Sequence, residues 1–425
     1  MGLVRQGRQV GRAWKWTSLL ALALVGAGPL AWSGQASAGE ANEGPVVKWE
    51  KTHPYTYGDF YGNVQRGPDG GIFFSRQAAD DRAHEIVLVE HSGTLKVAQT
   101  VTDEELGRLS HFIHTKDGGF LLAGPTRSNG PEGNLRLIKV NDDGEIVWAK
   151  TFRKNVGLDT RLLQTDDGGY VLAAVLNRPD RSTELYLAKL EPDGNPEWET
   201  TFEGAEYDAV TAVRQTVDGG IVLLGAVGQE DASYRLNRDL FLAKVDKSGE
   251  TVWERRHETG RDTVPRAFAE TPDGGLVIAG TDRTISDYRA GSGLGYLLKV
   301  DKDGKNVWEK RFAERTETSA LNDIQVTDDG DLLVSGCVKY EELNMNDASS
   351  DGYTAKLGED GETVWEKVFP NSTEQREQHL LLPISDEAFL TIGTGKKYEG
   401  GDYVFYVTQL QAERDRHGGQ AGRRP

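Results

Sequence analysis

The chain has 425 residues, a formal net charge of −18 at pH 7 and one cysteine. A surface this acidic repels nucleic acid and anionic lipid, which argues against both as partners. A single cysteine excludes an internal disulfide, so the fold must be stabilised by packing, and a chain of this length can bury the large core that this requires.

The first 38 residues have the pattern of a secretory signal peptide. Four basic residues come first: Arg5, Arg8, Arg12 and Lys15. They are followed by an apolar run over 17–32 that is short for a membrane span, and then by Ala36–Ala38, which fits a cleavage site. No cysteine stands at the cut, so we expect no lipid anchor. We predict cleavage after Ala38, a linker over 39–45, and a secreted, periplasmic or cell-surface protein without a membrane span. The mature net charge would be −18 − 4 = −22.

Two landmarks recur in phase along the rest of the chain. Tryptophans stand at 49, 148, 198, 253, 308 and 365, and Val97 occupies the place of a missing one. An Asp-Gly-Gly element or a variant of it occurs at 68–71, 116–119, 166–169, 217–220, 272–275, 328–331 and 385–388. Seven copies of each landmark predict seven structural repeats.

Each repeat is predicted to contain four strands. In the fourth repeat these cover 209–216, 221–226, 240–246 and 250–257. The glycines of the intervening tight turns supply the positive φ that such turns need. The two middle strands are apolar at consecutive positions, which indicates that both faces of each sheet are covered. We therefore predict an all-β, seven-bladed β-propeller with four antiparallel strands per blade.

The two ends of the repeat region are complementary. The last repeat has strands at 376–383, 388–393 and 402–410 but lacks its tryptophan-bearing strand, whereas 46–52 forms an isolated strand before the first repeat. We predict that the N-terminal strand completes the last blade and closes the ring, so that the propeller spans 46–411. Residues 412–425 are predicted to form a disordered tail, and the protein is expected to be a monomer.

The segment LAKVDKSGETVWER, residues 242–255, resembles the repeat of secreted microbial PQQ-like propellers, and the resemblance extends over nearly all of 46–411. That group includes quinoprotein dehydrogenases and outer-membrane assembly propellers. The quinoprotein pattern has an Asp two positions after Ala243, which is here displaced to Asp246. Those enzymes usually have eight blades, and their alcohol-oxidising members use a pair of adjacent cysteines that this chain cannot form. We therefore expect no cofactor, and a quinone-dependent oxidoreductase ranks third among the functions.

The connections between strands are unequal in length. Both tight turns of each repeat are predicted to lie on one rim, and long connections such as 227–239, 281–295 and 338–352 on the other. Long loops on a rigid scaffold commonly bind ligands, and tyrosine with arginine suits sugar rings that carry carboxylate or sulfate. The primary hypothesis is a module that binds a glycan or a protein; otherwise these are ordinary solvated loop residues. The predicted ligand-binding residues are Arg108, Tyr234, Arg238, Tyr288, Arg289 and Tyr340.

The alternative hypothesis is an extracellular polysaccharide lyase or hydrolase that acts on acidic glycans. Polar residues near the start of each inner strand are expected to approach the mouth of the central channel: Arg108, Asp159, Arg161, Asp208, Arg266, Asp323 and His379. An arginine beside a histidine or tyrosine can neutralise a uronate and abstract its proton, which is lyase chemistry. The candidate catalytic residues are His379, Arg266, Arg161 and Tyr207.

Three further patterns lead to predictions. His111 and His114 are three residues apart on a predicted strand, so they should face opposite sides, and no metal site is expected. Cys337 lies in an apolar run and is expected in the core. A polar residue three positions before the turn Asp recurs in five repeats, and it either lines the narrow end of the channel or hydrogen-bonds exposed strand edges: Arg66, His114, Gln164, Gln215 and Glu270.

Overall fold

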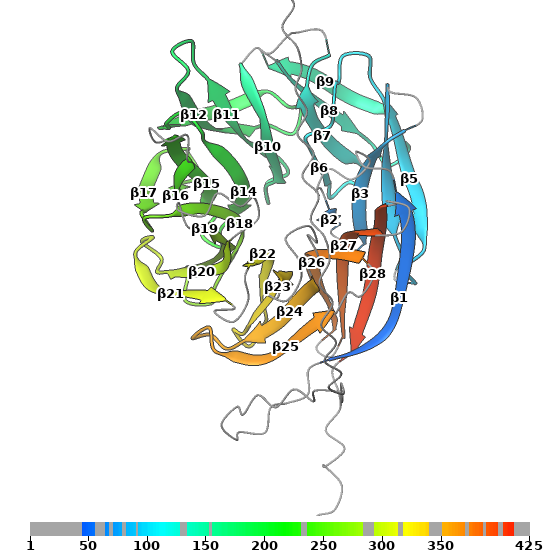
Figure 1. Cartoon of the computed structure of the whole chain (residues 1–425). Helices are drawn as coiled ribbons and strands as arrows, with labels where there is room; N and C mark the ends of the chain where they lie inside the picture. Colours follow the sequence, from blue (N-terminus) through cyan, green and yellow to red (C-terminus); the bar gives the residue numbers. More distant parts are fainter. Residues whose placement is uncertain are drawn as a thin grey trace, which may run out of the picture. The chain divides into compact units, whose positions relative to one another are not determined.

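Seven four-stranded antiparallel sheets make up the described part of the chain in the computed structural model. The structure describes residues 45–411 except 56–63, 68–70, 79–81, 91, 128–133, 153–154, 231–235, 284–292, 313–317, 340–350, 370–373, 386–387 and 398–402. The described residues all belong to one unit, 42–425, and they contain no helix. The sheets stand around a common axis, with their first strands innermost (Figure 1). The predicted seven-bladed propeller is therefore confirmed.

The first four blades follow one another along the chain. Blade 1 contains β2 (Val64–Arg66), β3 (Ile72–Gln77), β4 (Ala83–Val89) and β5 (Leu95–Thr102). Blade 2 contains β6 (His111–His114), β7 (Phe120–Pro125), β8 (Leu135–Val140) and β9 (Ile146–Phe152). Blade 3 contains β10 (Val156–Gln164), β11 (Tyr170–Asn177), β12 (Thr183–Leu190) and β13 (Pro196–Glu203). Blade 4 contains β14 (Ala209–Gln215), β15 (Ile221–Glu230), β16 (Leu236–Val245) and β17 (Thr251–His257).

The remaining three blades include the one that closes the ring. Blade 5 contains β18 (Asp262–Glu270), β19 (Leu276–Arg283), β20 (Leu294–Val300) and β21 (Asn306–Phe312). Blade 6 contains β22 (Thr318–Val326), β23 (Leu332–Lys339), β24 (Asp351–Leu357) and β25 (Thr363–Phe369). Blade 7 contains β26 (Glu374–Ser385), β27 (Ala388–Lys397), β28 (Tyr403–Gln411) and, from the opposite end of the propeller sequence, β1 (Val46–Tyr55).

The ring closes as predicted. Strand β1 pairs antiparallel with β28, and the pairing places Trp49 opposite Gln409 and Tyr55 opposite Tyr403. The Trp49 ring also packs against blade 1, where a Cβ added to Gly93 would lie 2.8 Å from it. The paired strand runs three residues beyond the predicted 46–52, so the closing contact is longer than the sequence pattern indicated.

The core lies between neighbouring blades. Strand β15 is buried at eight consecutive positions, Ile221–Gly228, and one cluster combines its side chains with those of β11 and β12 in blade 3. The other large clusters likewise join adjacent blades, including one that spans blades 7 and 1. Both faces of the middle strands are therefore covered, as the unbroken apolar runs predicted.

An aspartate–lysine pair reinforces each Asp-Gly-Gly turn in blades 2 to 5. In blade 4, Gly219 takes a φ of +82°, and the carboxylate of Asp218 accepts hydrogen bonds from Thr216 and from the amide of Gly220. The Lys244 amine on β16 lies 2.6 Å from the same carboxylate. Equivalent lysines, 3–9 % exposed, pair with the turn Asp in three other blades: Lys139 with Asp117, Lys189 with Asp167, and Lys299 with Asp273.

We expect these pairs to make stability depend on pH in acid. Hydrogen bonds from Lys244 and Thr216 lower the pKa of Asp218 from its ordinary value of 3.8 to about 2. Ionised Asp218 therefore stabilises the fold above about pH 4, and this contribution is lost as the pH falls toward 2. Urea unfolding between pH 5 and 2 should show a weaker pH dependence for Lys244→Met than for the unmodified protein. Lys302→Met, which removes a pair within one exposed turn, should keep the original dependence; equal slopes in all three proteins would contradict the assignment.

In several blades a tryptophan joins the outer strand to the next blade. The Trp253 indole donates a hydrogen bond to the Lys302 carbonyl in the outer turn of blade 5, at 3.1 Å, and covers Gly304. Trp198 does the same to the outer turn of blade 4, which contains Lys247 and Gly249. Because a Cβ at Gly249 would lie 2.5 Å from the Trp198 ring, this glycine is required both by its φ of +84° and by the indole above it.

A second contact on the same rim joins the innermost strand of one blade to the turn of the preceding blade. Gln164 of blade 3 accepts a hydrogen bond from the backbone amide of Lys116 in the turn of blade 2, at 2.7 Å. Gln215 and Glu270 accept equivalent bonds from the preceding turns, at Asp166 and Val217. Of the two predicted roles for these polar residues, edge bonding is confirmed at these three positions.

Some sequence-based expectations for the opposite rim are wrong. The segment 227–239 is mostly strand rather than loop, because β15 and β16 continue pairing up to Glu230 and Leu236. Cys337 is half-buried rather than fully enclosed.

Candidate functional site

The innermost strand of several blades carries a β-bulge near its loop-side end. In β14, β18, β22 and β26 the register shifts by one residue, seven positions before the turn Asp, which leaves one residue unpaired in each: Thr211, Arg266, Asn322 and His379. Bulges re-aim side chains and are frequent beside active sites. The bulge therefore gives Arg266 and His379, in blades 5 and 7, equivalent backbone positions facing the axis; the side chain of His379 lies outside the described residues.

Glycine makes room for each described bulge. A Cβ on Gly280 of β19 would lie 2.5 Å from the carbonyl oxygen of Val264, two residues before the bulged Arg266. Gly225 and Gly336 face the corresponding carbonyls in blades 4 and 6. Glycine at these three positions of the second strands is thus required by a close backbone approach.

His111 is held as a neutral ring between two blades. Its Nδ1 accepts a hydrogen bond from the amide of Leu162 in blade 3, at 3.2 Å, and its Nε2 lies 3.2 Å from the side-chain amide of Gln65 in blade 1. Burial, with a smaller contribution from the Arg161 charge, holds the pKa of His111 well below its ordinary value. Because a backbone amide can only donate, Nδ1 is the acceptor and the proton of the neutral ring is on Nε2; a hydrogen bond from Nε2 to Gln65 then requires that the Gln65 side-chain amide turns its oxygen toward the ring.

Arg161 links blade 3 to the bulge of blade 4. Its Nε donates to the carbonyl of Thr211 at 2.7 Å, and its Nη1 donates to the carbonyl of Thr160 at 2.9 Å. Burial lowers the pKa of Arg161, with Asp159 opposing and Arg266 adding to the shift. The guanidinium is thus fixed in place near a second guanidinium of blade 5.

Four arginines of blades 3, 4 and 5 are linked by the influence of their charges, and we call them the arginine row: Arg161 and Arg266 on innermost strands, Arg283 on a second strand and Arg238 on a third strand. Arg238 contacts the buried carboxylate of Asp262 through two hydrogen bonds of 2.7 and 3.0 Å, and Arg283 lies 4.0 Å from the same carboxylate. Burial lowers the pKa of Arg283, and the neighbouring charges of Arg238 and Arg266 lower it further. Arg266 is exposed, and no described residue forms a hydrogen bond or ion pair with it.

The other predicted site residues are spread out. Arg108 is exposed just before β6. Tyr207 is exposed, and Glu230 raises its pKa, so the phenol is protonated at neutral pH and is a poor base. Asp208 organises the loop, accepting bonds from Thr183, Ala205 and Gly228. Four predicted ligand-binding residues lie outside the described residues: Tyr234, Tyr288, Arg289 and Tyr340.

Asp262, Arg283 and Gln65 were not predicted as site residues. Arg283 stands on a second strand and Arg238 on a third strand. The apolar pattern of these strands indicated core residues, and the segments that follow or precede them were predicted as loops. Counting back from each turn Asp would have found Gln65, which stands four residues before the Asp of the first turn.

The two histidines of the H-x-x-H pattern have separate surroundings. His114 stacks on Phe73 with ring centroids 4.6 Å apart, and its Nε2 lies 3.2 Å from the Gly118 carbonyl. His111 instead contacts Leu162 and Gln65, as described above. Within the described ranges, no group of three His, Cys, Asp or Glu residues could hold a metal ion.

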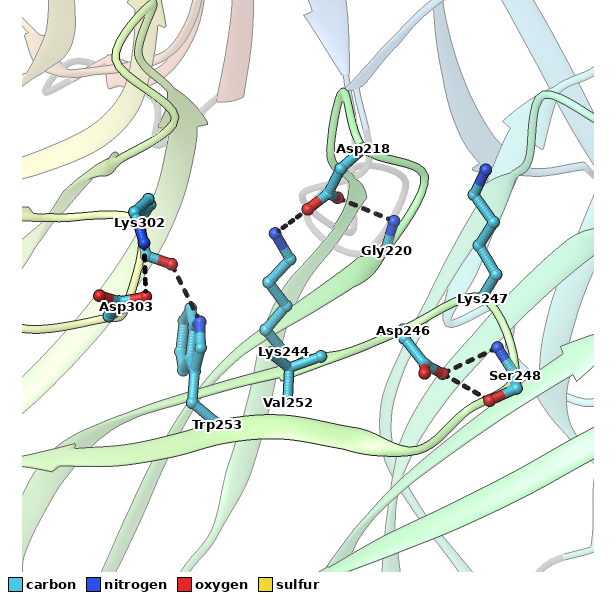
Figure 2. Close-up of a pocket in the computed structure, with 10 residues that line it drawn as sticks. All are labelled: Asp218, Gly220, Lys244, Asp246, Lys247, Ser248, Val252, Trp253, Lys302 and Asp303. Atoms are coloured by element: carbon cyan, nitrogen blue, oxygen red, sulfur yellow. Dashed lines mark hydrogen bonds and ion pairs between the residues drawn. The ribbon is translucent and has the colours of Figure 1, made fainter.

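A separate groove of about 580 Å³ lies between blades 4 and 5 on the turn rim. Figure 2 shows Lys244 directed at Asp218 and the Trp253 indole directed at the Lys302 carbonyl. Its three lysines are matched by three aspartates: Lys244, Lys247 and Lys302 with Asp218, Asp246 and Asp303. The groove is therefore the joint between two blades, and the arginine row is the better candidate for a ligand site.

The fold is a seven-bladed β-propeller, and its repeats resemble those of PQQ-like propellers. Residues 131–338 match the family model of the outer membrane protein assembly factor BamB, so this part of the chain is similar to that family in sequence. No curated protein matches the chain significantly. Among the described residues there is no helix that is long and apolar enough to cross a membrane.

Solved structures share the architecture at low identity. A PL25 ulvan lyase bound to -[GlcA(1-4)Rha3S]- has a TM-score of 0.57 and 12% identity, over 85% of this chain and 96% of that one. A protein of unknown function from Dyadobacter fermentans has a TM-score of 0.48 and 12% identity, over 87% of this chain and 99% of that one. At these identities the likeness concerns the fold alone.

Proposed function

We propose that this protein binds acidic glycans at the loop-side end of the propeller axis, where the arginine row holds their carboxylate or sulfate groups. The observation that carries the proposal is the row itself, in a chain whose net charge is −18. The charge of Arg266 lowers the pKa of Arg161, and the charges of Arg238 and Arg266 lower the pKa of Arg283, while Asp262 is already engaged with Arg238. An anionic ligand relieves this repulsion, and guanidinium binds carboxylate and sulfate through paired hydrogen bonds.

Two further observations support the glycan reading. The ulvan lyase of similar fold was solved with a chain of glucuronate and sulfated rhamnose, so a propeller of this shape can hold such a ligand. The signal-like segment 1–38 is consistent with a place outside the cytoplasm, where such glycans occur. We propose a secreted, periplasmic or cell-surface monomer.

We expect Arg266→Gln to weaken binding of uronate or sulfated oligosaccharides about tenfold, because a charged hydrogen bond contributes about 1.5–3 kcal/mol. Isothermal titration at fixed ionic strength measures this directly. The matched control is Arg255→Gln, which removes a guanidinium that lies over the Trp253 ring on an outer strand. Equal affinities of the two variants, or binding of neutral glycans only, would contradict the proposal. Binding of an acidic protein in place of a glycan would contradict the proposed class of ligand.

The second candidate is a lyase acting on acidic glycans at the same place. It is favoured by the equivalent bulge positions of Arg266 and His379, with Arg161 close to Arg266. In this reading arginine neutralises the uronate and a base removes its proton. Incubation with uronic-acid polysaccharides, followed by the absorbance of unsaturated sugar, separates the two candidates, since a binding module yields no product.

A further inference from the structure

Arg214 is a second cation on the axis that the arginine row does not include. It stands on β14 four residues before the turn Asp218, whereas Arg161 stands six residues before Asp167. Two residues along a strand span about 6.6 Å, so Arg214 lies a layer deeper, toward the turn rim. It is therefore separate from the loop-side mouth.

The surroundings of Arg214 place its guanidinium in solvent on the axis. The side chain is exposed although it belongs to an innermost strand, so solvent reaches it. Its guanidinium carbon lies 5.8 Å from the centre of the Phe268 ring in blade 5. Phe268 belongs to the core between blades 4 and 5, whereas its neighbours Ala267 and Ala269 pack in the core between blades 5 and 6, so Phe268 is the side chain that blade 5 presents to Arg214.

The charge of Arg214 has no acceptor in contact. Among the described residues, none forms a hydrogen bond or an ion pair with it. Asp323 of blade 6 is close enough to influence its charge, yet no ion pair joins them. Asp323 is itself buried and receives the amide of Gln325 at 3.3 Å. Desolvation by the surrounding protein lowers the pKa of Arg214, and the charge of Asp323 opposes this shift.

We propose that Arg214 forms a second anion site inside the propeller, which takes a single carboxylate, sulfate or phosphate group. An arginine that is enclosed, solvated and without a paired acceptor has its whole donor fork available to one oxyanion. The site does not depend on the arginine row binding a glycan. The oxyanion can be free in solution or can be the end group of a glycan that enters from the mouth.

The first experiment uses selenate as the probe, in crystals of the full-length mature protein. We expect an anomalous peak within hydrogen-bond distance of the Arg214 guanidinium in the unmodified protein and in Arg266→Gln. The peak should be absent in Arg214→Gln. A peak at the same place in Arg214→Gln, or no peak at Arg214 in any crystal, overturns the proposal.

The second experiment measures the site in solution and identifies the source of the oxyanion. Sulfate stabilises most proteins by exclusion from their surface, so its effect on melting is compared with chloride at equal ionic strength and across variants. The melting temperature of the unmodified protein and of Arg266→Gln should rise more with sulfate than that of Arg214→Gln. Equal rises in all three contradict an Arg214 site. If Arg214→Gln also weakens binding of an acidic oligosaccharide about tenfold, the group is the glycan's; if only the sulfate effect is lost, it is a free oxyanion.

Discussion

Deleting residues 46–55 is expected to lower the free energy of unfolding more than any single substitution in the chain. The deletion removes the whole of β1, which pairs with β28 along its full length, and exposes a new edge on blade 7. It also removes Trp49 from the cluster between blades 7 and 1. At about 1 kcal/mol per net backbone hydrogen bond, the loss is about 5 kcal/mol, which is a large part of the total stability of most domains. Urea unfolding followed by tryptophan fluorescence measures the change.

The control for this deletion is removal of residues 412–425, which lie outside the described residues. We expect the shortened C-terminus to leave the urea midpoint unchanged, since β28 ends at Gln411. If both truncated proteins unfold at the same denaturant concentration, the closing strand has no special role.

Gly249→Ala is expected to destabilise the protein by about 3 kcal/mol. An alanine at positive φ costs about 1 kcal/mol by itself, and overpacking adds 1–3 kcal/mol. Here the new methyl group would lie 2.5 Å from the Trp198 ring, which is fixed by its hydrogen bond to the Lys247 carbonyl. Thermal and urea unfolding of the variant provide the measurement.

The matched control is Gly168→Ala. Gly168 has a φ of +87°, nearly the same as that of Gly249, but nothing lies within 4 Å of its added Cβ. This variant should lose only the stability that the strained backbone conformation costs, about 1 kcal/mol. The difference between the two variants therefore measures the indole contact, and no difference would mean that the tryptophan moves aside freely.

Much of the scaffold follows from the sequence because its determinants are local and repeated. The tryptophans and the Asp-Gly-Gly turns recur in phase, and the lone strand at 46–52 matches the missing strand of the last repeat. The length of the blade 4 hairpin was harder to predict. Residues 227–230 and 236–239 include Gly228, Gln229, Asn237 and Asp239, whose propensities favour a loop, but pairing across the hairpin overrides them.

The candidate site is only partly predictable from sequence. Arg161 and Arg266 were predicted because they stand near the starts of inner strands. Arg283 joins them only through pairing, since β19 places it opposite Asp262. Arg238 reaches the same carboxylate from the neighbouring blade. No local pattern reports such contacts between blades, and the bulge that gives Arg266 its position is visible only in the register.

The bulges on the inner strands leave the unpaired residue free of the backbone constraint that shapes the rest of the strand. In blades 4, 5 and 6 the irregularity is accommodated by main-chain atoms, a carbonyl resting on a glycine, so the identity of the protruding residue is free of that constraint. Threonine, arginine, asparagine and histidine occupy the four equivalent places. One blade can thus change its side chain at this position while its neighbours keep theirs, with no change to the packing between blades.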